Sequence, residues 1–329
     1  MVEKLKEEIL KDKDEQQFQE LCLEIFYYQA KENLVYKSYL EALNIKPEKI
    51  NKIENIPFLP ISFFKTAKVL CKNAKPVITF ESSGTTGMQT SKHYVSDPDF
   101  YRVASEKIFN SFYGNLKDFS IYALLPSYLE RSNSSLIFMV QHFIENAQQD
   151  SGFYLNNIEK LVEQLAEAKS KNKKIILLGV TFALLDLAEK YEIDLSSVIV
   201  METGGMKGRR KEMIREEIHE ILKKRLNISE VHSEYGMTEL LSQFYSRQNG
   251  VFSGPDWAGI LIRDVSDPFS VNTSRQNGTI NVIDLANIDS CCFIETNDIG
   301  KFTEEGHKHF EVRGRLDKSD IRGCNLLIT

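Results

Sequence analysis

A run of small hydroxyl residues and glycine follows the apolar stretch VITF and reads FESSGTTGMQTSK. Glycines let successive backbone N–H groups face an anion, and hydroxyls add donors, so such a loop has the chemistry to wrap a triphosphate. No GxxxxGK[ST] pattern fits, so it is not a Walker A loop. An exposed turn without a ligand is the alternative for this run taken alone. Its candidate phosphate-binding residues are Ser82, Ser83, Gly84, Thr85, Thr86 and Gly87.

The second segment with recognisable chemistry is VIVMETGGMKGRR. Its apolar strand ends in Glu202 and Thr203, Gly204 and Gly205 follow, and we expect a helix to begin near Lys207. Ligands of open α/β sheets bind beyond the carboxyl ends of the strands, where paired glycines let a flat ring approach the backbone. The alternative is a tight strand-to-helix turn.

The third segment, VHSEYGMTELLSQF, contains Tyr235, Gly236, Met237, Thr238 and Glu239. An aromatic ring can stack on adenine, a threonine hydroxyl can meet a phosphate, and a carboxylate can hold Mg²⁺. The alternative is the capped start of a helix, with Thr238 as the cap. No one of the three segments decides the function alone.

Composition narrows the class of protein. The 329 residues are 42% hydrophobic and 27% charged, which is ordinary for a globular enzyme. The net charge of −6 gives no reason to expect a nucleic-acid partner. No apolar run approaches the roughly 20 residues of a membrane span. The charged N-terminus lacks the apolar stretch of a secretory signal, so we predict a cytoplasmic protein.

The cysteines favour neither a disulfide framework nor a zinc site, because their number is odd, they are scattered, and no CxxC occurs. We expect reduced thiols that pack as small hydrophobic groups. The five are Cys22, Cys71, Cys291, Cys292 and Cys324.

Hydrophobic periodicity predicts the elements that must position these segments. Residues 1–50 have apolar residues at three- and four-residue steps and form a predicted helical N-terminal layer. Pro57 and Pro60 then lead into an extended stretch before the first sheet. No domain boundary is evident, so we expect one domain over residues 1–329.

From residue 119 onward apolar runs alternate with amphipathic segments, which predicts a parallel or mixed sheet with helices on its faces. The apolar runs are IYALLP, SLIFMVQHFI, IILLGV and SVIVMET. In the expected helix KGRRKEMIREEIHEILKKRL, one apolar stripe contains Met213, Ile214, Ile218, Ile221 and Leu222. The tail segments GTINVIDLAN and HFEVRGRL alternate like strands with one exposed face, around the expected turn residues Asn297 and Asp298.

Five motifs occur in order: SSGTTG, TGG, YGMTE, IETNDIG and RGRLD. This ordered set resembles the adenylate-forming superfamily of acyl- and aryl-CoA ligases, peptide-synthetase adenylation domains and luciferases. The resemblance spans most of the chain and implies an α/β fold, the large N-terminal domain of these enzymes, with stacked mixed sheets and flanking helices. It also implies ATP and Mg²⁺ as cofactors.

The resemblance assigns a role to each motif residue. Residues 82–87 would form the phosphate loop, Gly204 and Gly205 would flank the adenine, and Tyr235 and Gly236 would contact it. Thr238 and Glu239 would contact phosphate and Mg²⁺, with Glu239 as the metal ligand. Asp298 would accept the ribose hydroxyls, and Arg315 would stand at the hinge after the large domain.

Two departures from the superfamily pattern narrow the resemblance. The proline and lysine that usually follow the phosphate loop are replaced by MQTS before Lys92. The small C-terminal domain, which normally supplies a lysine, would begin after Arg315, and we expect it to be absent and residues 316–329 to form a mobile tail. Charge alone suggests Lys207 or Lys92 as the phosphate partner instead.

One branch is similar in both respects, the acyl-protein synthetases, which are the fatty-acid-activating component of the bacterial luminescence fatty acid reductase. The match extends to LPSYLERSNSSLIFMV, TGGMKGR and the terminal RGC. It implies that a fatty acid is activated and that Cys324 receives the acyl group as a thioester for a reductase or another acceptor protein. A thiolate on a mobile tail can attack an activated carbonyl, which agrees with that role.

Two alternatives stay open at this point. The chain could be an aryl- or acyl-CoA ligase similar to the phenylacetate-CoA ligase branch, or a non-catalytic adenylate-binding regulator. Glu239, Asp298 and Arg315 together argue against the regulator. A protein that only binds an adenylate does not need both a carboxylate for Mg²⁺ and a carboxylate that accepts the ribose hydroxyls.

Overall fold

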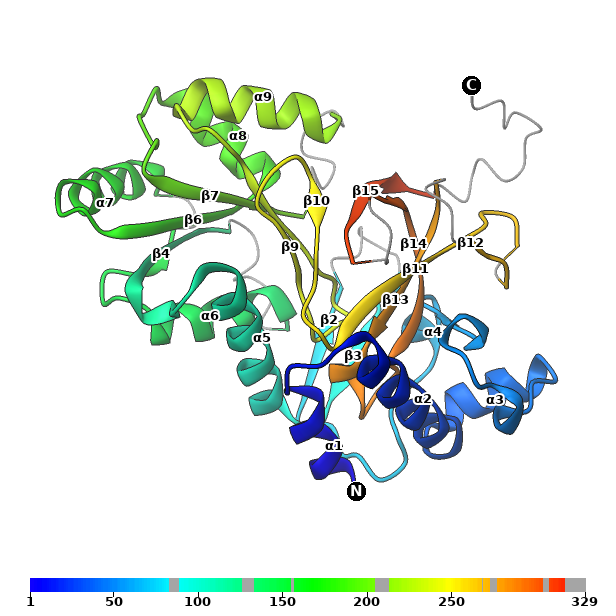
Figure 1. Cartoon of the computed structure of the whole chain (residues 1–329). Helices are drawn as coiled ribbons and strands as arrows, with labels where there is room; N and C mark the ends of the chain where they lie inside the picture. Colours follow the sequence, from blue (N-terminus) through cyan, green and yellow to red (C-terminus); the bar gives the residue numbers. More distant parts are fainter. Residues whose placement is uncertain are drawn as a thin grey trace.

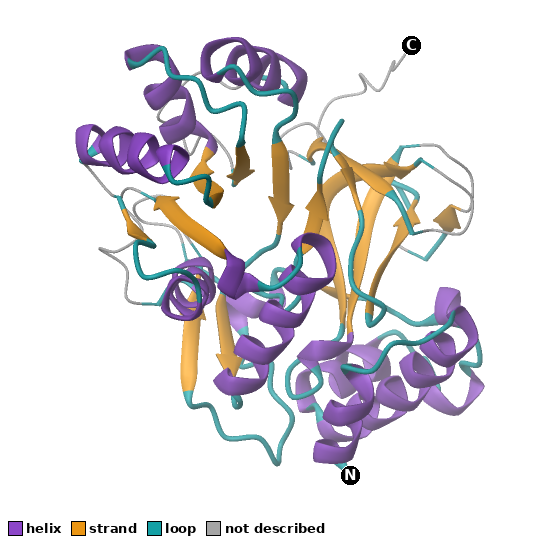
Figure 2. Ribbon diagram, turned by 60° about the vertical axis from the view of Figure 1, so that its left-hand side comes forward, coloured by secondary structure: helices purple, strands orange, loops and turns teal. Residues whose placement is uncertain are grey.

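The computed structural model describes residues 1–82, 89–125, 133–154, 157–204, 213–267, 269–272, 277–303 and 308–316. In this part of the chain, two large sheets and one hairpin are surrounded by helices (Figures 1 and 2). The predicted α/β class is confirmed.

The first sheet has the strand order β5-β4-β6-β7-β8-β9 and is parallel except for β9. Its central strands are continuous apolar runs because helices cover both faces (Figure 1). The strands are β4 Phe119–Leu124, β5 Gly152–Phe153, β6 Lys174–Val180, β7 Val198–Thr203, β8 His232–Tyr235 and β9 Phe244–Ser246. The helices around it are α5 Pro98–Tyr113, α6 Ser135–Asn146, α7 Ile158–Ser170, α8 Thr181–Lys190 and α9 Arg215–Leu226.

The second sheet has the order β10-β15-β14-β13-β11-β12, and β1 pairs with β14 in parallel. Its strands are β1 Leu59–Pro60, β10 Val251–Phe252, β11 Ala258–Arg263, β12 Val271–Asn272, β13 Gly278–Asp284, β14 Phe293–Phe302 and β15 Phe310–Arg315. A separate antiparallel hairpin consists of β2 Ile78–Glu81 and β3 Lys92–Val95. The connection between β2 and β3 contains the SSGTTG motif.

Helices occupy the first 50 residues, as the periodicity predicts, and α2 packs beside the second sheet (Figure 1). The buried Gln29 side chain of α2 donates to the carbonyls of Asn287 and Ile288 and accepts from the N–H of Cys292. The remaining helices are α1 Val2–Ile9, α2 Glu15–Glu32, α3 Leu34–Ala42, α4 Phe63–Thr66 and the 3₁₀ turns η1 Pro47–Lys49, η2 Ile53–Asn55, η3 Leu116–Asp118 and η4 Leu285–Asn287.

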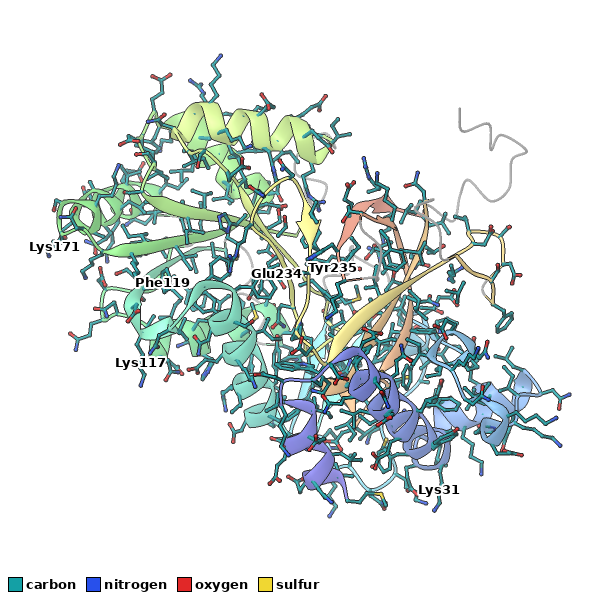
Figure 3. The ribbon with its side chains drawn as sticks, viewed as in Figure 1. Lys31, Lys117, Phe119, Lys171, Glu234 and Tyr235 are labelled. Atoms are coloured by element: carbon teal, nitrogen blue, oxygen red, sulfur yellow. The ribbon has the colours of Figure 1, made fainter. Side chains whose placement is uncertain are left out.

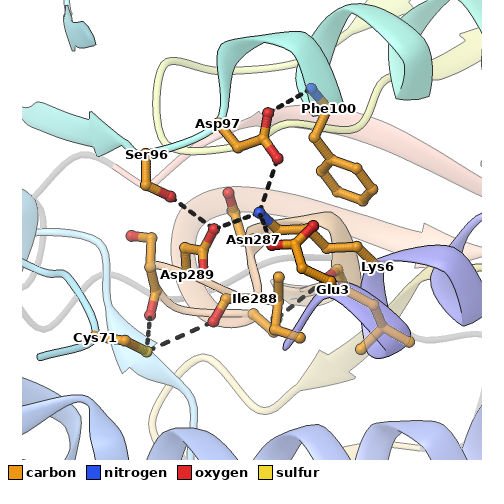
Figure 4. A network of polar contacts seen from close by, with 12 residues as sticks. Glu3, Lys6, Cys71, Ser96, Asp97, Phe100, Asn287, Ile288 and Asp289 are labelled. Atoms are coloured by element: carbon orange, nitrogen blue, oxygen red, sulfur yellow. Dashed lines mark hydrogen bonds and ion pairs between the residues drawn. The ribbon is translucent and has the colours of Figure 1, made fainter. Parts of the chain in front are cut away.

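A buried ion network ties α1 to the start of α5 and to the loop before β14 (Figure 4). The Lys6 ammonium lies 2.9 Å from a carboxylate oxygen of both Asp97 and Asp289. Burial alone would lower the pKa of Lys6, but the hydrogen bonds to both carboxylates outweigh it and the pKa is raised. Asp97 also caps α5, and Ser96 donates to Asp289. The N-terminal helix α1 is therefore anchored both to α5, beside the first sheet, and to the loop that precedes β14 of the second sheet.

The two sheets meet at a group of four aromatic rings, which we call the aromatic seam: Tyr235, Phe244, Phe252 and Phe310. Their ring centroids are 5.2 to 6.1 Å apart. Two rings belong to β8 and β9 of the first sheet and two to β10 and β15 of the second. Figure 1 shows β9 and β10 running side by side where the sheets join.

Four sequence expectations are wrong in detail. Met213 and Ile214 precede α9, which begins at Arg215, so only the later residues of the expected stripe lie on the helix; Ile214 is 62% exposed. Asn297 and Asp298 lie inside β14, where pairing with β15 overrides their turn preference. Strand β13 has no exposed face, because every residue is buried. The apolar run SLIFMVQHFI lies within α6.

Four thiols, those of Cys22, Cys71, Cys291 and Cys292, are buried and free, and burial raises the pKa of each. Their predicted role as packing groups is confirmed. Among the described residues, no helix combines the length and apolar character that crossing a membrane requires.

Arg215 connects α9 to both sheets. Its Nε lies 3.5 Å from the buried Glu202 carboxylate at the end of β7, and its Nη1 donates to the carbonyl of Val312 on β15 at 2.9 Å. The guanidinium also lies over the Phe252 ring of the seam, 5.0 Å from its centroid. One side chain thus holds the end of β7 beside β10 and β15.

We expect Arg215→Met to lower the free energy of unfolding by about 2 kcal/mol, because Glu202 loses a cationic partner while buried. Urea denaturation measures the change. Arg225→Met on the same helix is the matched control, since its partner Glu192 is 82% exposed and its loss should change stability by less than about 0.5 kcal/mol. Equal losses in both variants would contradict this role of Arg215.

Candidate nucleotide-binding site

The carboxyl ends of β7 and β8 lie side by side, with Thr203 opposite Glu234 in the parallel register. Gly204 and Tyr235 are therefore neighbours at this edge of the sheet. Gly204 has φ +70°, a conformation that favours glycine, and its carbonyl accepts a 2.7 Å hydrogen bond from the Thr181 hydroxyl. Gly204 thus lies at the carboxyl end of β7, where the sequence predicts it.

Tyr235 reaches from this edge to the second sheet. Its hydroxyl donates to Asp298 Oδ2 at 2.8 Å, and Arg315 Nε lies 3.9 Å from the other carboxylate oxygen. Asp298 and Arg315 are register partners on β14 and β15. Burial raises the pKa of Asp298, although the Tyr235 hydroxyl and the Arg315 charge oppose the shift. Three predicted residues from three strands are brought together.

Gly236 follows Tyr235 in close contact with Glu234. A Cβ at this position would fall 2.4 Å from Glu234 Oε1. A side chain here would therefore require the buried Glu234 carboxyl to move.

The next turn presents Thr238 and Glu239. These residues form no helix, so the capped-helix alternative for this segment is wrong; instead the Leu240 N–H bonds to the Met237 carbonyl. Glu239 is 5% exposed, and burial raises the pKa of its carboxyl against a hydrogen bond from Ser91 and the Arg315 charge. The hydrogen bond and the nearby charge do not offset the cost of burying this carboxylate, so a bound cation would stabilise its ionised form.

Ser82, the first residue of the predicted phosphate loop, and Ser91, which follows the loop, pair with each other beside the Thr238–Glu239 turn. The Ser82 N–H donates to the Ser91 carbonyl at 3.1 Å, and the Ser91 N–H donates to the Ser82 hydroxyl at 2.9 Å, which closes the base of the loop. Ser91 also contacts the Glu239 carboxyl. The predicted residues Ser83, Gly84, Thr85, Thr86 and Gly87, with Gly205, Lys207 and Cys324, lie outside the described residues.

Lys92 starts β3 on the side of the loop, half-exposed, with its ammonium 3.9 Å from the Glu81 carboxylate. It follows Ser91 directly, so it is the nearest described lysine in sequence to the loop.

The donor set fits Mg²⁺ held jointly by one carboxylate and by phosphate oxygens. In the described ranges, no three His, Cys, Asp or Glu side chains gather as they would around a metal held by protein alone. Mg²⁺ commonly uses one or two carboxylates together with substrate phosphates. Glu239 is the residue that would hold it.

Sequence reasoning missed Glu234, which is buried beside Tyr235 (Figure 3). Burial, together with the Glu202 charge, raises the pKa of Glu234 to about 7, while the Thr203 hydroxyl donates to it and opposes the shift. The signal was its place in SEYGMTE, one residue before the predicted aromatic ring. Strand alternation points it away from the aromatic seam, toward Tyr101, Tyr113 and Tyr245. Burial raises the pKa values of these three tyrosines, and the Glu234 charge adds to the shift.

Comparison with known proteins finds solved structures of similar fold but low sequence identity. No protein-family model and no curated protein matches the chain. An open conformation of 2-hydroxyisobutyryl-CoA ligase, in complex with 2-HIB-AMP and CoA, is similar with a TM-score of 0.69 and 12% identity over 92% of this chain and 70% of that chain.

The same ligase in the thioesterification state gives a TM-score of 0.69 and 14% identity over 93% of this chain and 69% of that chain. An ATP-bound RpMatB-BxBclM chimera gives 0.52 and 16% identity over 72% and 47%. The fold is therefore that of the large N-terminal domain of adenylate-forming enzymes, as the motif order implies.

Stability should depend on pH through Glu234. Between its ordinary value of 4.5 and its folded pKa of about 7, the folded state keeps a proton that the unfolded state has released. The free energy of unfolding therefore falls as pH rises through this window, by on the order of 2 to 3 kcal/mol. Glu234→Gln, which resembles the protonated carboxyl, should flatten this decline.

Urea denaturation from pH 5 to pH 8 measures the effect. Glu163→Gln removes an exposed carboxylate and should keep the wild-type slope. An unchanged slope in Glu234→Gln would show that this carboxyl does not titrate in the window.

Proposed function

We propose that this protein uses ATP to activate a carboxylic acid as an acyl-adenylate and then transfers the acyl group to a thiol. The observation that carries the proposal is the convergence of Tyr235, Asp298, Arg315 and Glu239 at one junction of the fold. Structures with this fold contain an acyl-AMP with CoA, or ATP. Those ligands support a nucleotide as a ligand of this fold.

The chain's own residues suit the first half-reaction. A carboxylate oxygen of the acid attacks the α-phosphorus, a new P–O bond forms, and the bond to pyrophosphate breaks. The Tyr235 ring would stack on the adenine, and Asp298 would accept the ribose hydroxyls. The Thr238 hydroxyl would donate to phosphate, and Glu239 would hold Mg²⁺, which supplies charge neutralisation of the phosphates.

For the second half-reaction we propose a protein thiol, that of Cys324, and a long-chain fatty acid. The support is the similarity of the C-terminal sequence to acyl-protein synthetases. The thiolate attacks the carbonyl carbon of the adenylate, a C–S bond forms, and AMP leaves with the electron pair of the C–O bond. The thioester would then pass to a reductase or another acceptor protein.

A CoA ligase is the second candidate, because the hydroxyisobutyryl-CoA ligase structures contain CoA. A free thiol would then replace the protein thiol in the same attack. A non-catalytic adenylate-binding regulator is the third, and it predicts nucleotide binding without turnover.

The three candidates separate in one experiment. Acid-dependent ATP/pyrophosphate exchange is measured with a panel of fatty and aryl acids, and the same samples are analysed by intact-mass spectrometry. We expect exchange together with an acyl adduct on the protein. Exchange without an adduct, with acyl-CoA released when CoA is added, would support the CoA ligase instead. No exchange with any acid would contradict the proposed enzyme.

Cys324→Ser should keep the exchange reaction and lose the acyl adduct. Cys71→Ala is the matched control, because burial raises the pKa of the Cys71 thiol to about 12 and leaves it unreactive. An undiminished adduct on Cys324→Ser would rule out this cysteine as the acceptor.

Asp298→Asn should weaken ATP binding roughly 10- to 100-fold, because hydrogen bonds from the ribose to a charged acceptor are replaced by weaker ones. Isothermal titration calorimetry measures the affinity. Asp264→Asn, an exposed carboxylate just after β11, is the control and should bind ATP like the wild type. An unchanged affinity in Asp298→Asn would place the nucleotide elsewhere.

A further inference from the structure

The turn that carries Thr238 and Glu239 has no helix or strand to fix its backbone. Buried carbonyl groups need hydrogen-bond donors, so the partners of these two carbonyls must come from elsewhere in the chain. Both are found on side chains that are distant in sequence.

His93 on β3 provides the first donor. Its Nδ1 lies 2.9 Å from the Thr238 carbonyl, and the ring is 0% exposed. Burial lowers the pKa of His93 to about 4, although this hydrogen bond opposes the shift, so the imidazole is neutral at physiological pH. A carbonyl can only accept, so the proton of the neutral ring must be on Nδ1.

Asn287 in η4 provides the second donor. Its Nδ2 donates to the Glu239 carbonyl at 2.8 Å, and its own carbonyl accepts from Gln29 at 3.0 Å. The neighbouring Asp284 accepts from the N–H groups of Leu241 and Ser242, at 2.7 and 3.0 Å. The turn is therefore held on its far side by the end of β13.

We propose that His93 and Asn287 are positioning residues that hold the two successive carbonyls of Thr238 and Glu239, and thereby aim the Glu239 carboxylate at the metal ion of bound Mg-ATP. The proposal rests on the proposed function. His93 follows the phosphate loop by a few residues, and Ser91 of the same strand end contacts the Glu239 carboxyl. The hairpin that carries the loop thus also fixes the metal carboxylate.

The chemistry of position 93 supports this assignment over simple packing. The ring packs edge-on against Phe64 with centroids 5.7 Å apart, an environment that an apolar side chain would fill without burying a polar group. The buried imidazole gains only the one hydrogen bond to Thr238, and its Nε2 is without a partner among the described residues. A partly satisfied buried polar group is destabilising, so a histidine at this position is accounted for by the Thr238 carbonyl that it holds in place.

The test compares the Mg²⁺ dependence of ATP binding in wild type and variants by calorimetry. His93→Leu removes the donor and should raise the Mg²⁺ concentration for half-maximal ATP binding about 10-fold, as expected for a group that orients a metal ligand. ATP affinity in the absence of Mg²⁺ should stay near the wild-type value. His93→Asn, whose side-chain amide can donate from near the Nδ1 position, should restore most of the Mg²⁺ dependence.

Tyr122→Phe is the structural control, because it removes the 2.7 Å hydrogen bond to Asp150 far from the turn. It should lower Tm without changing the Mg²⁺ dependence. If His93→Leu does not fold, Asn287→Ala tests the second carbonyl with the same readout. A His93→Leu or Asn287→Ala protein with lowered Tm and wild-type Mg²⁺ dependence would overturn the positioning role. Wild-type protein that binds no Mg-ATP would overturn the proposed function as well.

Discussion

The aromatic seam is the contact on which the rest of the site depends. Rings from four strands close the junction between the sheets, and the Tyr235 hydroxyl then lies within bonding distance of Asp298. Aromatic pairs are large, rigid and directional, so they set the separation of two sheets more tightly than flexible side chains would. The distance between the β8 edge and the β14 carboxylate follows from this packing.

Buried carboxyl groups gather around the end of β8. Glu234, Glu239 and Asp298 all have raised pKa values because burial outweighs their hydrogen bonds. Glu202 differs: burial would raise its pKa, but the neighbouring His219, the Arg215 charge and Ser233 lower it, and the Thr181 hydroxyl donates to its carboxylate at 2.9 Å. The protein thus stabilises the ionised form of Glu202, whereas the ionised forms of Glu239 and Asp298 lack sufficient cationic or hydrogen-bonding partners. A magnesium ion and ribose hydroxyls would supply such partners.

The sequence predicts local features of this site better than long-range ones. The runs IILLGV and SVIVMET become β6 and β7 because they bury both faces, and the turn after β7 falls at Gly204 as expected. Asn297 and Asp298 have the local propensity of turn residues but lie in β14, because pairing with β15 is a long-range contact that local propensity does not report. Glu234 and His93 were missed for the same reason, since their burial and partners come from segments tens to more than a hundred residues away.

The site is assembled from three units that share few bonds. The β2–β3 hairpin meets the YGMTE turn through Ser91 and His93, and that turn meets the second sheet through Tyr235 and Asn287. Each unit has its own ladder or core, so loss of these contacts would separate the motifs while both sheets stay paired. A site at such a junction is precise only when its supporting shell is complete. The carbonyls of Thr238 and Glu239 are accordingly held by two buried side chains, those of His93 and Asn287.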